Sequence, residues 1–348
     1  MKSLIVASTR EDAGKTSTII ALARILGKRF GYLKPLGDRF LYRKKRLWDY
    51  DASLLTQLFG LGEEPETLSI GFDHSKLRYL YDRTAIFEEL NRIVNQVGVD
   101  REAVFIECGR DLAYGASVCL DPLTISQETG APVLILASGG EDEIADDLAF
   151  IHRFVGSDEA NVAGVIINKV VQMEDFCQVH RPEIEKLGVG VLGVLPYQAE
   201  FSTISLDAVA DKLLAKVLAG EDGLRNRVRS VVVGAMSVDA ALVDPQISDP
   251  DKLVITSGDR SDMILAMMET EGTAGIVLTN DIIPPANIVA KASEQNVPLL
   301  VVPGDTYSTA LRIEKIGPLL RAEDEEQIAK FAAMVSDHVD MEAIRELL

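Results

Sequence analysis

The chain has 348 residues, 47% of them hydrophobic and 26% charged, which is typical of a globular protein and long enough for two domains. Its formal net charge of -19 repels phosphate backbones and anionic lipid, so neither nucleic acid nor a membrane is the expected main partner. The three cysteines have no metal-ligand spacing, which is typical of a reducing environment. The sequence shows no signal-like beginning and no apolar run of about 20 residues, so we expect a cytoplasmic protein.

The first element is a buried strand at residues 4–7, and a helix follows over residues 16–27. The loop between them ends in Gly14, Lys15 and Thr16. A helix that begins there directs its free N–H groups at a phosphate, while Lys15 supplies charge and the Thr16 hydroxyl is a magnesium ligand. This stretch therefore predicts a phosphate-binding loop.

The first glycine of the usual loop pattern is missing, because its place is taken by Thr9, or by Ser8 in a longer variant of the loop. The alternative is therefore an ordinary helix start on which Gly-Lys-Thr occurs by chance. The residues expected to contact a nucleotide in this loop are Thr9, Gly14, Lys15, Thr16 and Ser17.

The next strand is expected at residues 30–37, and charged residues lie at its end and after it. Lys34 stands at its end, where open α/β sheets bind ligands, and is either an anion-binding or a solvated lysine. A basic cluster spans residues 39–46 and is either a contact for phosphate or an acidic partner, or a solvated face. Asp51 opens a helix, which leaves capping and magnesium binding as its two roles.

A buried strand at residues 103–109 carries Glu107, a carboxylate placed to hold magnesium or its water shell. Further strands are expected at residues 132–137, 162–168 and 189–195, separated by helices. Alternating strands and helices predict an α/β fold: a doubly wound, mainly parallel sheet of P-loop type, with a second, smaller α/β domain after it.

The order of these motifs resembles the dethiobiotin synthetase group of P-loop proteins over about residues 1–215. The resemblance implies ATP and Mg²⁺ as cofactors, with Thr16, Asp51 and Glu107 on the metal, Asn168 on the base, and Lys15 and Lys34 as catalytic lysines. It also implies a homodimer. The segment after Glu107 departs from that family, because Arg110 and Asp111 replace a glycine-rich substrate pocket.

The chain is expected to consist of three parts: a P-loop domain at residues 1–220, a second α/β domain at residues 225–322 and an acidic helical tail at residues 323–348. Strands are expected in the second at residues 231–234, 252–256, 275–279 and 298–302, and a helix at residues 206–221 precedes it. Asp259, Asp281 and Asp305 follow three of the strands and most simply cap the next helices.

The second domain is similar to the DRTGG domain, with residues 258–262 at the signature position and Ser261 and Asp262 in place of Thr-Gly. That domain resembles small-ligand regulatory domains and accompanies a dethiobiotin synthetase-like domain in phosphate acetyltransferases. The catalytic acetyltransferase domain of those enzymes is not expected in these 348 residues.

Three functions fit these patterns. The first is an ATP-binding regulatory protein whose second domain senses a small ligand and whose partner is an enzyme of acyl metabolism such as phosphate acetyltransferase. The second is an ATP-dependent ligase that activates a carboxylate by phosphoryl transfer. The third is an assembly protein whose phosphate loop has decayed.

Overall fold

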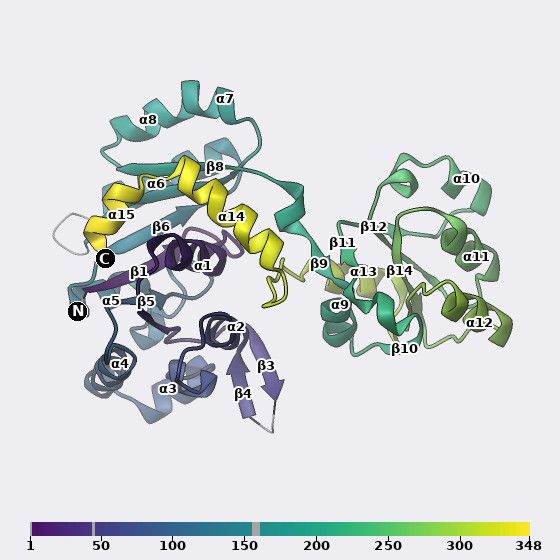
Figure 1. The fold of residues 1–348 in the computed structure, drawn as a ribbon, viewed down its shortest axis with the longest axis horizontal. Helices are drawn as coiled ribbons and strands as arrows, with labels where there is room; N and C mark the ends of the chain where they lie inside the picture. The colour runs from purple at the N-terminus through teal and green to yellow at the C-terminus, as the bar shows by residue number, and fades with distance from the viewer. Residues whose placement is uncertain (1, 44–45, 155–160) are drawn as a thin grey trace. The chain divides into compact units, whose positions relative to one another are not determined.

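The structure is a computed structural model and describes residues 2–43, 46–154 and 161–348 (Figure 1). Contacts within the chain divide it into two compact units: unit 1 consists of Met1–Tyr197 and Leu320–Leu348, and unit 2 of Gln198–Leu319. The domain boundary expected near residues 220–225 thus lies inside unit 2. The tail expected as a separate part at residues 323–348 belongs to unit 1.

Unit 1 is built on a six-stranded sheet in the order β2-β5-β1-β6-β7-β8, in which every neighbouring pair is parallel. Its strands are buried on both faces, which explains their continuous apolar sequences. The antiparallel hairpin β3-β4 lies outside this sheet. The strands are β1 (Lys2–Ser8), β2 (Phe30–Leu33), β3 (Phe40–Arg43), β4 (Arg46–Asp49), β5 (Ala103–Glu107), β6 (Val133–Ala137), β7 (Val162–Val170) and β8 (Val191–Pro196).

Helices cover both faces of this sheet, as the alternation of strands and helices predicts. Within unit 1 they are α1 (Lys15–Leu26), α2 (Tyr50–Phe59), α3 (His74–Leu80), α4 (Arg83–Val97), α5 (Pro122–Thr129), α6 (Glu141–Phe154), α7 (Met173–Asp175), α8 (Arg181–Lys186), α14 (Glu325–His338) and α15 (Met341–Leu347). A π-helical turn, Phe176–His180, joins α7 to α8.

The tail completes unit 1. Helix α14 packs beside α1 (Figure 1) and buries Phe331 and Val335, while Arg24 of α1 forms an ion pair with Glu325 at 2.5 Å. After α14 the chain continues along the edge strand β8, where Val339 forms a β-bridge with Gly193. The apolar face of α14 is thus buried against α1 and the edge strand β8.

Unit 2 contains a five-stranded sheet in the order β10-β15-β14-β13-β12, parallel except for its edge strand β10. The strands of unit 2 are β9 (Ile204–Ser205), β10 (Lys216–Ala219), β11 (Arg227–Val228), β12 (Ser230–Val233), β13 (Lys252–Ser257), β14 (Thr273–Thr279) and β15 (Leu299–Val301). Its helices are α9 (Leu206–Leu213), α10 (Val238–Leu242), α11 (Ser261–Glu269), α12 (Ala286–Glu294) and α13 (Thr306–Glu314).

Two expectations for this half were wrong. The helix expected at residues 206–221 ends at Leu213, and β10 follows it, because residues 216–219 pair with β15. Of the three aspartates expected to cap helices, only Asp305 does so, by accepting a hydrogen bond from Ser308 N at 2.9 Å. Helix α11 has Arg260 at its N-cap and α12 has Pro285.

Gly258, at the signature position of unit 2, has a steric reason to be glycine. A Cβ added there would lie 1.8 Å from the carbonyl oxygen of Ile282. The strand end of β13 and the turn after β14 therefore pack backbone to backbone. This close approach fixes the loops at the carboxyl edge of the sheet, the edge where open α/β sheets bind ligands.

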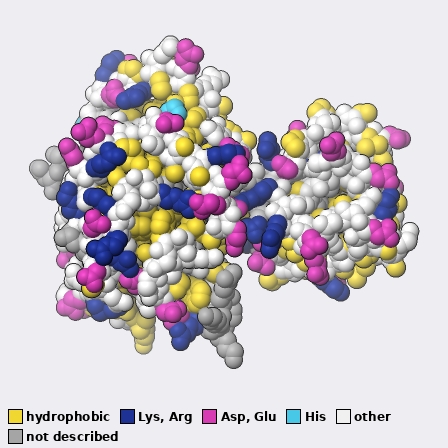
Figure 2. Space-filling model, viewed as in Figure 1, with side chains coloured by type: hydrophobic (Ala, Val, Ile, Leu, Met, Phe, Trp, Pro, Cys, Tyr) yellow, Lys and Arg dark blue, Asp and Glu magenta, His cyan; other side chains and the backbone are white. Residues whose placement is uncertain are grey.

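No helix among the described residues is long and apolar enough to cross a membrane. On the face of unit 1 that Figure 2 shows, basic and acidic side chains are interspersed, so this face carries no extended field of one sign.

Candidate functional site

The loop between β1 and α1 has the conformation of a helix start with a left-handed turn. Gly14 is the N-cap of α1 with φ 97°, and no side chain caps the helix there. Within residues 8–16, all of which are described, positive φ angles occur only at Asp12 and Gly14. Thr9 therefore occupies the place of the missing glycine without strain, since its backbone does not need glycine's freedom.

Lys15 lies under this loop. Its side chain is buried, and Nζ donates hydrogen bonds to Ser8 Oγ at 2.7 Å and to the main-chain oxygen of Arg110 at 3.3 Å. Burial lowers the pKa of the Lys15 ammonium, against the opposing attraction of Glu107. The ammonium is thus held between the end of β1 and the segment that follows β5.

Glu107 lies at the end of β5, fully buried, and accepts two hydrogen bonds. Thr16 Oγ1 donates to its Oε1 and Tyr32 OH to its Oε2, both at 2.9 Å. Burial, followed by the nearby charge of Asp51, raises the pKa of Glu107 to about 7, although Lys34 opposes the shift. The two hydrogen bonds fix the orientation of this carboxylate towards the phosphate loop.

Lys34 is the centre of a buried charged cluster. Its Nζ lies 2.6 Å from Asp51 Oδ2, 2.5 Å from Asp38 Oδ1, 3.6 Å from Asp49 Oδ2 and 3.8 Å from Glu107 Oε1. Burial would lower the pKa of Lys34, but the four carboxylates together raise it well above its ordinary value. The interpretation of Lys34 as a solvated lysine is therefore wrong, because only 1% of the residue is exposed.

The capping role that the sequence left open for Asp51 belongs to Asp49. Asp49 is the N-cap of α2, and its Oδ1 accepts hydrogen bonds from the backbone N–H of Asp51 and Ala52. Both aspartates belong to the Lys34 cluster, and Asp51 lies closer to the ammonium. Burial raises the pKa of Asp49 to about 6. Lys34 and Arg39 outweigh burial at Asp51 and lower its pKa to about 2.

A second set of contacts holds the loop from the outside. Asn168 Nδ2 donates to the carbonyl oxygen of Ala13 at 2.8 Å, and Lys169 Nζ donates to the carbonyl oxygen of Asp12 at 2.7 Å. The Asp12 carboxylate forms an ion pair with Arg39, which also lies 3.5 Å from Asp51. Asn168 thus contacts the loop backbone, whereas the resemblance assigned it to a nucleotide base.

The structure joins four of the expected residues by hydrogen bonds and ion pairs: Thr16, Lys34, Asp51 and Glu107. Lys15 hydrogen-bonds to Ser8 and to the main chain of Arg110, and Glu107 acts on its pKa by charge. Thr9 and Ser17 are the chain neighbours of Ser8 and Thr16, which take part in these contacts. The backbone N–H of Thr9 donates to Leu136 O, and Ser17 lies in the first turn of α1. Of the basic cluster, Arg39 joins the site, Arg46 pairs with Glu66, and Lys44 and Lys45 lie outside the described residues.

Sequence reasoning missed Tyr32, Asp38 and Asp49. A signal existed for Tyr32, because residues i and i+2 of a strand share a face, which places Tyr32 beside Lys34. The pattern Asp-x-Asp at the start of a helix was a signal that one aspartate caps the helix and the other is free for another role. Asp38 had no such signal, since it follows the strand in a loop.

The fold and site define an α/β protein of P-loop type, because they combine a parallel sheet, a loop that ends in Gly-Lys-Thr and charged side chains at the strand ends. The family described as AAA domain matches residues 2–205, more than half of the chain, so the chain belongs to this family. The DRTGG domain matches residues 208–316. The predicted order, a P-loop domain followed by a DRTGG domain, is confirmed.

The chain is also similar to phosphate acetyltransferases. That of Pseudomonas putida is 29% identical over 371 residues, an alignment that covers 98% of this chain and 51% of that protein. That of a Synechocystis species is 28% identical, with 99% and 52% covered. The chain therefore spans about half the length of the curated relatives it matches.

Two solved structures share less with the chain. A ParA family ATPase from Chlorobium tepidum is 12% identical, with 57% of this chain and 86% of that one covered and a TM-score of 0.37. The CBS and DRTGG domains of Clostridium perfringens pyrophosphatase, in complex with the activator diadenosine tetraphosphate, are 15% identical, with 44% and 74% covered and a TM-score of 0.29. The fold class rests on the sheet topology and not on these two structures.

Proposed function

We propose that unit 1 binds ATP together with Mg²⁺ and that the chain regulates acyl metabolism through this binding. The observation that carries the proposal is the buried network in which Lys34 holds four carboxylates beside the phosphate loop. Burying so many charges is costly, and such arrangements cluster at sites that bind charged ligands.

The donor set fits magnesium. Thr16, Asp51 and Glu107 offer a hydroxyl and two carboxylates, and Mg²⁺ prefers such oxygen ligands. When bound, the metal would neutralise charge on the nucleotide phosphates. Lys34 contacts the same carboxylates, so a metal bound there would release its ammonium for a phosphate or an acidic substrate.

The phosphate contacts are proposed from the loop. The N–H groups at the start of α1 and the Lys15 ammonium would hold the phosphates, with Gly14 providing the close backbone approach. Asn168 would act by holding the loop rather than by reading the base. Thr9 and Ser17 are proposed as further nucleotide contacts of this loop.

Thermal unfolding with ATP, ADP and GTP in the presence of Mg²⁺ tests this proposal. A ligand at 100 times its dissociation constant adds about 2.7 kcal/mol of stability. Lys15→Ala should abolish the shift, and Lys76→Ala, which removes an exposed lysine of the same unit, should not. A protein that no nucleotide stabilises would contradict the proposal.

The regulatory role rests on the DRTGG match and the phosphate acetyltransferase relatives. Unit 2 would sense a small ligand at the carboxyl edge of its sheet, and the chain would act on a phosphate acetyltransferase. The test is to measure that enzyme's activity in cell extract supplemented with the wild-type chain or with Lys15→Ala, each with and without Mg-ATP. Equal activities in all mixtures would argue against regulation.

A second candidate function is an ATP-dependent ligase that phosphorylates a carboxylate. The position of Lys34 beside Asp51 and Glu107 favours it, because a lysine at a phosphate site stabilises the charge that develops on the transferred group. Arg110, which is exposed and stacks over Tyr114, would be a contact for the acid. ATP-dependent phosphate release that requires an added carboxylate would establish this function.

A homodimer and a cytoplasmic location remain proposals. The dimer is implied by the resemblance to P-loop proteins that pair across their nucleotide sites. Light scattering with and without Mg-ATP measures it directly, and a mass of one chain in both states would exclude it.

A further inference from the structure

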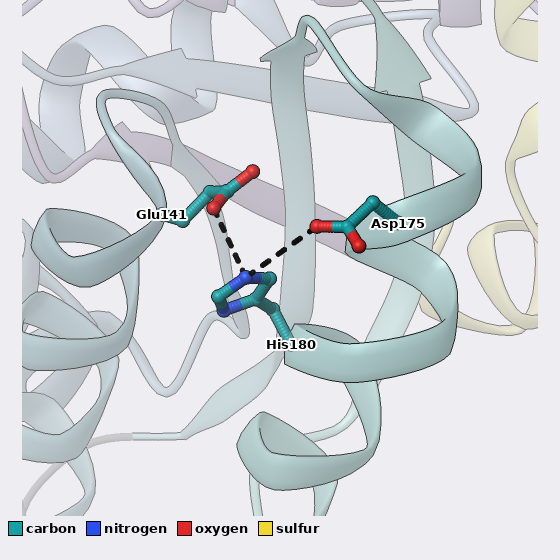
Figure 3. Close-up of side chains that lie close together, drawn as sticks. All are labelled: Glu141, Asp175 and His180. Atoms are coloured by element: carbon teal, nitrogen blue, oxygen red, sulfur yellow. Dashed lines mark ion pairs between the residues drawn. The ribbon is translucent and has the colours of Figure 1, made fainter.

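A cluster of three metal-ligating side chains lies outside the phosphate loop (Figure 3). The close-up shows Glu141 and Asp175 both directed at the imidazole of His180. The distance from His180 Nε2 is 3.0 Å to Glu141 Oε2 and 4.0 Å to Asp175 Oδ2. One ligand atom from each residue lies within 4.8 Å of the others.

The local backbone creates this arrangement. Residues 176–180 form a π-helical turn, in which Arg181 N donates to Phe176 O, five residues earlier. In such a turn residues five apart share a face, so Asp175 and His180 lie on one side, whereas an α-helix would place them apart. Single π-helical turns are uncommon and occur frequently at functional sites.

The imidazole is also held in place by packing. Phe176 is fully buried and its ring stacks on that of His180, with centroids 5.6 Å apart and an interplanar angle of 26°. Glu141 is fixed independently, because it is the first residue of α6. The three ligand atoms thus come from α6 and from the continuous segment formed by α7 and the π-helical turn, which Phe176 anchors to the core of unit 1.

We propose that Glu141, Asp175 and His180 bind a divalent transition metal ion of the zinc class. Zinc bonds of about 2.0–2.2 Å to nitrogen and oxygen place tetrahedral ligand atoms roughly 3.3–3.6 Å apart. The observed distances of 3.0 and 4.0 Å lie on either side of that range, so small side-chain rotations suffice. The imidazole favours zinc over magnesium, whose preferred ligands are oxygens.

Three protein ligands leave a coordination position for water or an anion. Glu141 and Phe176 also line a cavity of about 480 Å³, together with the loop residues that follow β6 and β7. The ligand set therefore reaches the wall of a space that can hold such a molecule. The metal also ties the start of α6 to the α7–α8 segment.

Calorimetric titration of the full chain with Zn²⁺ tests the site, with Mg²⁺ in excess to occupy oxygen-only sites. The expected result is one zinc bound with an affinity that His180→Ala and Asp175→Asn each lower by more than about 100-fold, beyond the loss typical of an outer-shell partner. Matched controls are His152→Ala and Asp146→Asn, exposed residues of α6 that do not line this cavity and should leave binding unchanged.

Cobalt distinguishes the ligands. Co²⁺ bound by nitrogen and oxygen in a tetrahedral site gives visible absorption without the near-ultraviolet band of a thiolate ligand. Cys177 lies within the π-helical turn, so Cys177→Ser is the decisive comparison. The proposal predicts no effect of this change. A thiolate band that Cys177→Ser removes, zinc binding that survives His180→Ala, or no binding by the wild type would overturn it.

Discussion

Two buried lysines show how differently the two units use the same side chain. Lys34, at the end of β2 in unit 1, is surrounded by carboxylates, whereas Lys252, at the start of β13 in unit 2, donates to the main-chain oxygens of Glu271 and Asp249. Carbonyls accept hydrogen bonds but carry no net charge. Lys252 therefore closes a turn, while Lys34 is the counter-ion of buried carboxylates.

The largest effect is expected for Lys34→Met, because it leaves the carboxylates of the cluster buried without their cation. Removing one partner of a buried pair costs about 3–5 kcal/mol of unfolding free energy. Trp48, the only tryptophan of the chain, lies in unit 1, so urea unfolding followed by its fluorescence reports this unit. A loss below about 1 kcal/mol, the size of an exposed pair, would show that the cluster is hydrated rather than buried.

Glu107→Gln should remove a pH dependence. With a pKa raised from 4.5 to about 7, folded Glu107 holds a proton that the unfolded chain has released. Its contribution to stability is therefore present below about pH 4.5 and is lost as pH rises to 7, on the order of 3 kcal/mol in total. Unfolding of the metal-free protein at several pH values measures it, and equal slopes for wild type and variant would contradict this pKa.

Lys252→Met should have a smaller effect than Lys34→Met, since it leaves carbonyl oxygens unsatisfied instead of charges. The expected loss is about 1–3 kcal/mol. It should appear in circular dichroism as an earlier transition of unit 2, while the Trp48 fluorescence transition keeps its midpoint. Equal losses for the two lysine variants would remove the distinction drawn between them.

The smallest effect is expected for Asn168→Ala, which removes one hydrogen bond to Ala13 O and costs about 1 kcal/mol. Because Asn168 holds the phosphate loop, this variant should also weaken nucleotide binding without changing the preference between ATP and GTP. A changed preference would instead restore the base-reading role that the resemblance implied.

The sequence was sufficient to predict those parts of the site that depend on residues close together in the chain. The strand, Gly14-Lys15-Thr16 and the helix after it could be predicted, because burial and helix starts leave short-range patterns. The caps of unit 2 were predicted less well, since Asp259 and Asp281 occupy the same position in their repeats as Asp305 but only Asp305 precedes its helix directly. The surface on which the tail helix packs could not be predicted, because an amphipathic sequence shows which face of a helix is buried but not what buries it.

That tail gives unit 1 a particular order of assembly during synthesis. All six strands of the unit 1 sheet precede residue 197, whereas helix α14 and the bridge formed by Val339 are added only after the whole of unit 2 has been synthesised. The inserted unit can fold first, and the phosphate-loop unit closes last. A chain that stops near residue 319 would therefore carry every expected phosphate-site residue and still lack the helix that packs against α1. Excising unit 2 while keeping residues 320–348 is the sounder way to isolate unit 1.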